Sequence, residues 1–254
     1  MKIIIPELQN STIQEAIADF PTVEFLPADN LTHATEILMN GEADSILSGL
    51  DYSSRDVLLA YRDHIPLKSN YFSSSFICQK DSQILALADG GVNKLPNQDQ
   101  LYCIVEDTAE TFQAYTGEQP RIAMLSYSTN GSGGKNPDLE KIHFVIDQIR
   151  KNHPDWFIDG EMQLDAAIDP TISAKKFPTS EVPGNANILI TPDLNSGNIL
   201  YKAMERFGGF TMAGPIIQGF TKPLADLSRG STAKDVTLTL NVLIKQLERS
   251  QQNA

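Results

Sequence analysis

Short apolar runs alternate with helical patterns along most of the chain. The apolar runs, rich in β-branched residues, are KIII, VEFL, ADSILSG, IAML and ANILI. The segments with helical periodicity are 31–40, 53–63, 98–115, 137–151 and 196–206. This alternation predicts an α/β fold with a mainly parallel sheet, whose ligands bind beyond the carboxyl ends of the strands.

The composition limits the partners of this chain. Its 254 residues suffice for one large domain or two modest ones. With 20 basic and 32 acidic residues the net charge is −12, which argues against a nucleic-acid or anionic membrane surface but not against small phosphates. The start MKIIIPEL is too short for a signal-peptide core, and no apolar run approaches a membrane span of ~20 residues. We therefore expect a cytoplasmic protein.

The cysteines and histidines give no sign of a metal site. Cys78 and Cys103 stand alone in apolar contexts, as expected for buried free thiols in a reducing compartment. The four histidines form no metal-ligand spacing, so we expect neither a metal nor another cofactor.

Three loops rich in small residues each follow an apolar run and precede a helical segment. They are SGLDYSSRD (48–56), SYSTNGSGGKNPD (126–138) and TPDLNSGN (191–198). Free N–H groups at a helix start attract anions, so these loops favour a phosphate-bearing or acyl substrate. The second of them is neither a nucleotide-binding P-loop nor a dinucleotide fingerprint.

A fourth such segment, DLSRGSTAKDV (226–236), has two interpretations. Thr232 and Asp235 have the spacing of a capping box. Apolar residues then recur at helical spacing (Val236, Leu240, Leu243 and Leu247), so a helix should begin here. The same run also gathers a serine, an arginine and acids that could carry chemistry.

Several blocks together resemble the phosphate acetyl/butyryl transferases. They are LADGGVNKLPNQDQL, AMLSYSTNGSG, IDGEMQLDAAIDP, ANILITPDLNSGNILYK and GPIIQGFTKPLADLSRGSTAKDV. The resemblance implies a two-domain, three-layer α/β fold like that of isocitrate and isopropylmalate dehydrogenases, with an interdomain cleft. It implies one domain of residues 1–70 plus 221–254 and a second of 71–220. The implied reaction moves an acetyl or short acyl group between coenzyme A and phosphate, in a homodimer and without a metal.

The resemblance places the family's catalytic residues on Ser228, Arg229 and Asp235. A thiol titrates near ~8.5, so attack on acetyl phosphate benefits from a base such as Asp235. Arg229 would hold the phosphate or the developing oxyanion, and Ser228 would add a hydrogen bond.

The predicted substrate contacts lie in two of the small-residue loops. We assign the oxygens of acetyl phosphate to Ser128, Thr129, Gly131, Ser132 and Asn198. Asn198 could equally cap a helix.

The chain departs from the family pattern in two places. Several dozen residues usual before GEADSILSGL are absent, including a basic segment. Leu59 stands where an active-site arginine is expected, and Tyr52 replaces a histidine. Arg55 and Arg62 lie about one helical turn to either side of Leu59, so either could reach the same anion or be a solvated charge. Two hypotheses follow: an acyltransferase with Tyr52 and Arg55 in its site, or an impaired relative that binds a phosphorylated metabolite or acyl phosphate as a sensor or partner protein.

Overall fold

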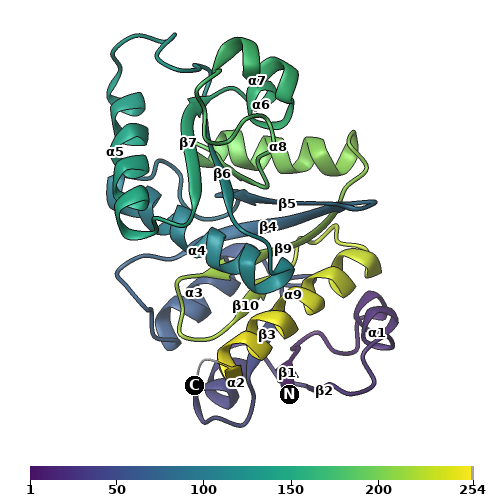
Figure 1. Ribbon diagram of the computed structural model, residues 1–254. Coiled ribbons are helices and arrows are strands. Elements are labelled where there is room, and N and C mark those ends of the chain that lie inside the picture. Colours follow the sequence, from purple (N-terminus) through teal and green to yellow (C-terminus); the bar gives the residue numbers. More distant parts are fainter. Residues whose placement is uncertain (253–254) are drawn as a thin grey trace. The chain divides into compact units, whose positions relative to one another are not determined.

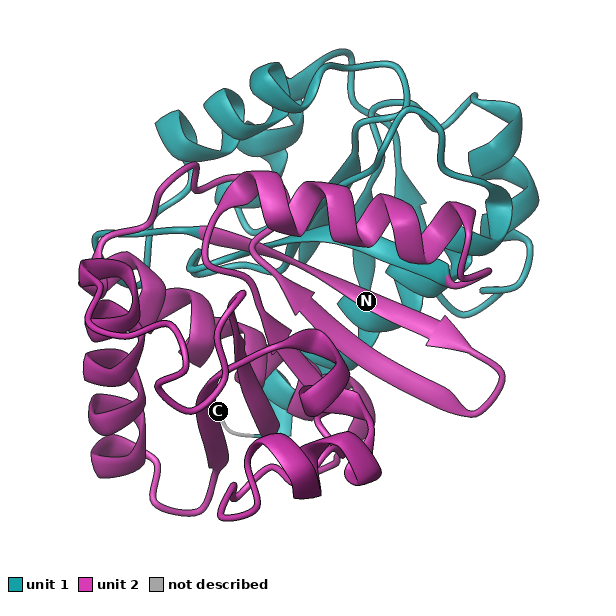
Figure 2. Cartoon of the chain, turned by 90° about the horizontal axis from the view of Figure 1, so that it is seen from above, with its two compact units in different colours: residues 1–72, 211–254 teal, residues 73–210 magenta. Residues whose placement is uncertain are grey.

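A computed structural model describes residues 1–252, which form two compact units. The first unit comprises residues 1–72 and the segment from Thr211 onward, and the second comprises residues 73–210 (Figures 1 and 2). The second crossing between the units therefore lies about ten residues before the position that the sequence suggested. The reason is that β9 (Thr211–Gln218) pairs antiparallel with β10 (Leu224–Asp226) and so joins the first unit.

The first unit is a three-layer α/β body. Its strands lie in the order β2-β1-β3-β10-β9, and all but β9 run parallel. Helices α2 and α3 pack together on one face and α1 and α9 on the other (Figure 1). The remaining bounds are β1 Lys2–Ile4, α1 Ser11–Ile17, β2 Glu24–Leu26, α2 Leu31–Met39, β3 Ser45–Ser48, α3 Ser54–His64 and α9 Ala233–Gln252.

The second unit has the same layered design. Its strand order is β4-β5-β8-β6-β7, with only β4 antiparallel to its neighbour. Helices α4 and α5 cover one face, and α6, α7 and α8 the other (Figure 1). The bounds are β4 Ser73–Lys80, β5 Gln83–Ala88, α4 Gln98–Thr116, β6 Arg121–Leu125, α5 Pro137–Asn152, β7 Phe157–Met162, α6 Leu164–Ile168, α7 Pro170–Lys176, β8 Ile188–Ile190 and α8 Leu194–Arg206.

These elements confirm the predicted α/β fold class. Each apolar run of the sequence contains a strand, and each stretch of helical periodicity contains a helix. The last helix begins where the capping-box spacing predicts, and all four residues of its apolar series are buried. Burial of that stripe against β9 and β10 stabilises α9, because isolated helices have little stability of their own.

The two cysteines differ in their surroundings. Cys78 is fully buried in β4, and this burial raises the pKa of its thiol. Cys103 on α4 is only half-buried, because it lies at the margin of the apolar face of the helix, so the expectation of a second buried thiol is wrong. Neither forms a disulfide. Across residues 1–252, every helix is too short or too polar to span a bilayer.

Candidate active site

The candidate residues of the first unit lie on segments that leave one edge of its sheet. Strands β1, β3 and β10 run parallel, so their carboxyl ends share an edge. The segment after β3 carries Tyr52 and leads into α3, while Ser228 and Arg229 follow β10. This edge is where the parallel-sheet pattern predicts ligands.

Arg229 offers an unused cationic group at this edge. Its side chain is exposed and forms no hydrogen bond or ion pair with any of residues 1–252. Ser228 is half-buried; its carbonyl accepts from the Ser231 N–H at 2.9 Å, and its Oγ lies 3.5 Å from the Gly230 nitrogen. The turn thus fixes the backbone of Ser228 and leaves the guanidinium of Arg229 able to bind an anion.

Asp235 is a buried carboxylate with three hydrogen-bond donors. Its Oδ1 accepts from the Met212 N–H at 2.9 Å, and its Oδ2 accepts from the N–H and the hydroxyl of Thr232 at 2.8 and 2.7 Å. The Thr232 hydroxyl lies 3.4 Å from the Asp235 nitrogen, which completes the predicted capping box. A carboxylate has about four acceptor positions, so one remains open on Oδ1.

Helix α3 holds the other candidates of the first unit. Ser53 caps the helix by accepting from the Asp56 N–H. Arg55 is exposed and has no ion pair with any residue that the structure describes, whereas Arg62 forms an exposed ion pair with Asp63 at 2.8 Å. Arg55 is therefore the better placed of the two arginines to meet an anion, and Leu59 between them is half-buried.

Tyr52 is half-buried against the core between α2, α3 and the sheet. Burial and the nearby charges of Glu7 and Asp51 raise the pKa of its phenol. Its hydroxyl therefore stays protonated at neutral pH and can donate a hydrogen bond to a substrate.

Two buried carboxylates at the same edge were not predicted from the sequence. Asp226 ends β10 and is 1% exposed, and its Oδ1 has no hydrogen-bond partner within the described chain. Burial, the largest effect, raises the pKa of Asp226 to about 7. A hydrogen bond from Ser54 lowers this pKa, and the charge of Glu7 raises it further. Glu7, also buried, accepts from the Gly49 N–H at 2.8 Å through Oε1, while its Oε2 is unpartnered in the same part of the chain. Burial likewise raises the pKa of Glu7.

Gly49 allows these two acids to approach the loop after β3. Its φ is +119°, in the region that side chains disfavour, and a Cβ there would overlap the Asp226 carboxylate and the backbone of Leu227. Both acids therefore meet the loop at a position where only glycine fits without strain.

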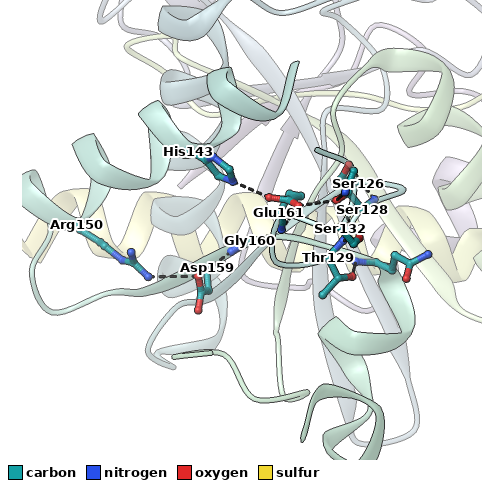
Figure 3. Close-up of polar contacts among 12 residues, drawn as sticks. Ser126, Ser128, Thr129, Ser132, His143, Arg150, Asp159, Gly160 and Glu161 are labelled. Atoms are coloured by element: carbon teal, nitrogen blue, oxygen red, sulfur yellow. Dashed lines mark hydrogen bonds and ion pairs between the residues drawn. The ribbon is translucent and has the colours of Figure 1, made fainter. Parts of the chain in front are cut away.

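In the second unit, a loop (residues 126–134) joins β6 to α5 and folds around the side chain of Glu161 (Figure 3). Glu161 lies on β7 and is completely buried. Its Oε1 accepts from the Ser128 hydroxyl at 2.6 Å and the Gly131 N–H at 2.8 Å, and its Oε2 lies 2.6 Å from His143 Nε2 on α5. Burial acts to raise the pKa of Glu161, but the hydrogen bonds from Ser128, Gly131 and His143 together hold it below its ordinary value.

The predicted substrate-binding residues of this loop differ in how much of their hydrogen-bonding capacity is still free for a substrate. Ser128 Oγ donates to Glu161, accepts from the Gly133 N–H at 2.7 Å and lies 3.2 Å from Ser132 Oγ, so its hydrogen-bonding capacity is filled. Thr129 Oγ1 accepts from the Gln163 N–H at 2.9 Å and keeps its own proton available. Ser132 is exposed.

Asn198 lies at the same edge of the second unit, within the first turns of α8. The cap of that helix is Asp193, which accepts from the Ser196 N–H, so Asn198 is not the cap. Its Nδ2 donates to the Gly90 carbonyl at 3.1 Å, in the turn after β5. Asp89 holds that turn by accepting from the N–H groups of residues 91–93 and from the Ser74 hydroxyl. The structure thus joins two of the blocks that carried the resemblance.

Comparisons with known proteins agree along most of the chain. A family model described as phosphate acetyl/butaryl transferase matches residues 2–244. A phosphate acetyltransferase from Clostridium acetobutylicum is 38% identical over 234 residues, which cover 89% of this chain and 70% of that protein. A phosphate acetyltransferase from Deinococcus radiodurans is 35% identical over 91% of this chain, but this chain spans only 33% of it.

A solved structure shows the same fold. The phosphotransacetylase from Streptococcus pyogenes superimposes with a TM-score of 0.87 at 28% identity, covering 98% of this chain and 94% of that one. The predicted family and its class of enzyme, an acyl-transferring transferase, are confirmed, and the comparisons hold nothing in favour of an impaired sensor. The chain belongs to the phosphate acetyl/butyryl transferase family.

Proposed function

We propose that this protein transfers an acetyl or other short acyl group reversibly between coenzyme A and inorganic phosphate. The observation that carries the proposal is the match to the transferase family over residues 2–244, which includes the Ser228–Arg229–Asp235 group. The uncommitted guanidinium of Arg229 and the open acceptor position of Asp235 are the features that this chemistry needs.

In the proposed reaction, the thiol of coenzyme A attacks the acyl carbonyl carbon of the acyl phosphate. A carbon–sulfur bond forms, the bond between that carbon and the phosphate oxygen breaks, and inorganic phosphate leaves. The thiol proton passes to the open position of Asp235, which acts as general base, and then to the departing phosphate, which keeps the electron pair of the broken bond. Arg229 neutralises the charge that develops on the phosphate or carbonyl oxygen, and Ser228 donates one hydrogen bond.

The remaining predicted residues bind rather than react. In the first unit, Tyr52 and Arg55 contact substrate. Arg55 supplies the positive charge that the family pattern places at the position of Leu59. In the second unit, the loop carrying Ser128, Thr129, Gly131 and Ser132, together with Asn198, holds the acyl phosphate. Thr129 and Ser132 make the direct contacts, because Ser128 and Gly131 are already bonded to Glu161.

The proposal extends to the working form of the protein. Coenzyme A and acyl phosphate are substrates, and no metal or other cofactor takes part. The enzyme works as a homodimer in the cytoplasm.

Calorimetric titration with the two substrates tests this function at the level of binding. We expect heat of binding with coenzyme A and with acetyl phosphate, and we expect Arg229→Gln to weaken acetyl phosphate binding roughly 10-fold by removing a charge-assisted hydrogen bond. Heat with acetyl phosphate but none with coenzyme A would contradict the transferase and favour a sensor.

A further inference from the structure

In the loop of residues 126–134, nearly every backbone N–H group has a hydrogen-bond acceptor. The N–H groups of residues 128 to 134 are donated to partners within the loop or on β7. Such a loop differs from an open anion-binding nest, whose N–H groups point at the ligand. Its shape is therefore fixed before any substrate binds.

Glu161 is the group on which this shape depends. Its carboxylate joins Ser128 to Gly131, and its main-chain carbonyl accepts from the Asn130 N–H at 3.1 Å. Because Ser128 Oγ in turn accepts from the Gly133 N–H and contacts Ser132, the carboxylate orders the loop from residue 128 to residue 133. A charged, fully buried acceptor makes stronger hydrogen bonds than a neutral one.

We infer that Glu161 is a positioning residue for acyl phosphate. By drawing Ser128 and Gly131 inward, it sets where Thr129 and Ser132 present their hydroxyls. The inference rests on the proposed function, in which this loop contacts the acyl phosphate. His143, whose side chain is half exposed, lies 2.6 Å from the other carboxylate oxygen of Glu161, on the side of helix α5.

A matched control lies two residues away on the same strand. Asp159 is also a buried carboxylate; it pairs with Arg150 at 3.3 Å and accepts from the Glu181 N–H at 2.9 Å. Its hydrogen bonds come from Arg150, Gly160 and Glu181, and none of them comes from residues 126–134. Figure 3 shows the contact with Arg150. Removing its charge should cost stability in a similar way without moving Thr129 or Ser132.

Steady-state kinetics of Glu161→Gln and Asp159→Asn in the full chain test the inference. Gln keeps the size of the side chain but loses the charge. We expect its KM for acetyl phosphate to rise roughly 10- to 100-fold, with its KM for coenzyme A within about twofold of the wild-type value. Asp159→Asn should leave both KM values within about twofold. Equal KM changes for both substrates, or no change, would overturn the positioning role.

Amide hydrogen exchange separates this inference from the proposed function. In Glu161→Gln the amides of Gly131 and Gly133 should exchange faster than in the wild type, whether or not the enzyme turns over. If the wild type shows no turnover, the proposed function fails. Unchanged amide exchange rates in Glu161→Gln would overturn the role of Glu161 in ordering the loop. Should Glu161→Gln not fold, Ser128→Ala removes one contact of the carboxylate and should shift the KM for acetyl phosphate in the same direction.

Discussion

Asp226 and Asp235 are both buried near the carboxyl edge of one sheet, yet their surroundings give them different chemistry. Three hydrogen-bond donors surround the carboxylate of Asp235. One oxygen of Asp226 has no donor within the described residues, and the charge of Glu7 lies nearby. The two carboxylates thus differ in hydrogen bonding, and at Asp226 burial and the charge of Glu7 raise the pKa and favour the protonated form.

The raised pKa of Asp226 makes stability depend on pH. Between its unfolded value of 3.8 and its folded value of about 7, the folded chain holds a proton that the unfolded chain releases, so stability falls as pH rises through this window. Asp226→Asn removes this titration. Relative to the wild type, the free energy of unfolding of the variant should gain roughly 2 to 3 kcal/mol between pH 5 and pH 8.

Urea denaturation of both proteins at several pH values measures this difference. A difference between variant and wild type that stays constant from pH 5 to pH 8 would show that Asp226 is ionised throughout. Enzyme activity does not enter the measurement, so the result bears on the environment of Asp226 alone.

The start of helix α9 combines a cap and the proposed catalytic base, Asp235, in one turn. The Thr232 hydroxyl donates a hydrogen bond to the Asp235 carboxylate. The same carboxylate accepts a hydrogen bond from the N–H of Met212, the second residue of β9. Capping therefore fixes the carboxylate in place, and the two interpretations of this segment describe the same geometry.

Paired variants separate the cap from the base. Asp235→Asn should lower kcat roughly 10²- to 10⁴-fold, because the amide cannot take the thiol proton. Thr232→Ala should cost about 1 kcal/mol of stability through loss of the cap, with a much smaller effect on kcat. Measured kcat values that fall equally in both variants would return Asp235 to a purely structural role.

The sequence was a better guide to the long helices than to the strands, because β4, β5, β7, β9 and β10 were not among the predicted runs. KIII, IAML and ANILI are β-branched or apolar runs with a clear signal. In contrast, β7 contains Asp159, Gly160 and Glu161, and β9 contains Pro215, all residues that strands disfavour. Buried hydrogen bonds and pairing with neighbouring strands override these preferences, and neither can be read from local sequence.

At the scale of the whole molecule, the sequence located the candidate loops better than it assigned their side chains. It placed Ser128 and Gly131 in a loop at the carboxyl end of a strand, where the structure has them, whereas Asn198, predicted at the end of such a loop, lies within helix α8. It could not show that Glu161, about 30 residues farther along, takes up the hydrogen bonds of Ser128 and Gly131. Such pairings arise only when parallel strands bring distant segments to one edge of a sheet.

The rate of thioester formation from acetyl phosphate and coenzyme A tests the central claim most directly. The purified full chain should form acetyl-coenzyme A and release one phosphate per thioester, and the reverse reaction should proceed from acetyl-coenzyme A and phosphate. Propionyl and butyryl phosphate in parallel would reveal the preferred acyl group. No thioester from any of the three acyl phosphates at saturating concentrations would contradict the proposed transfer.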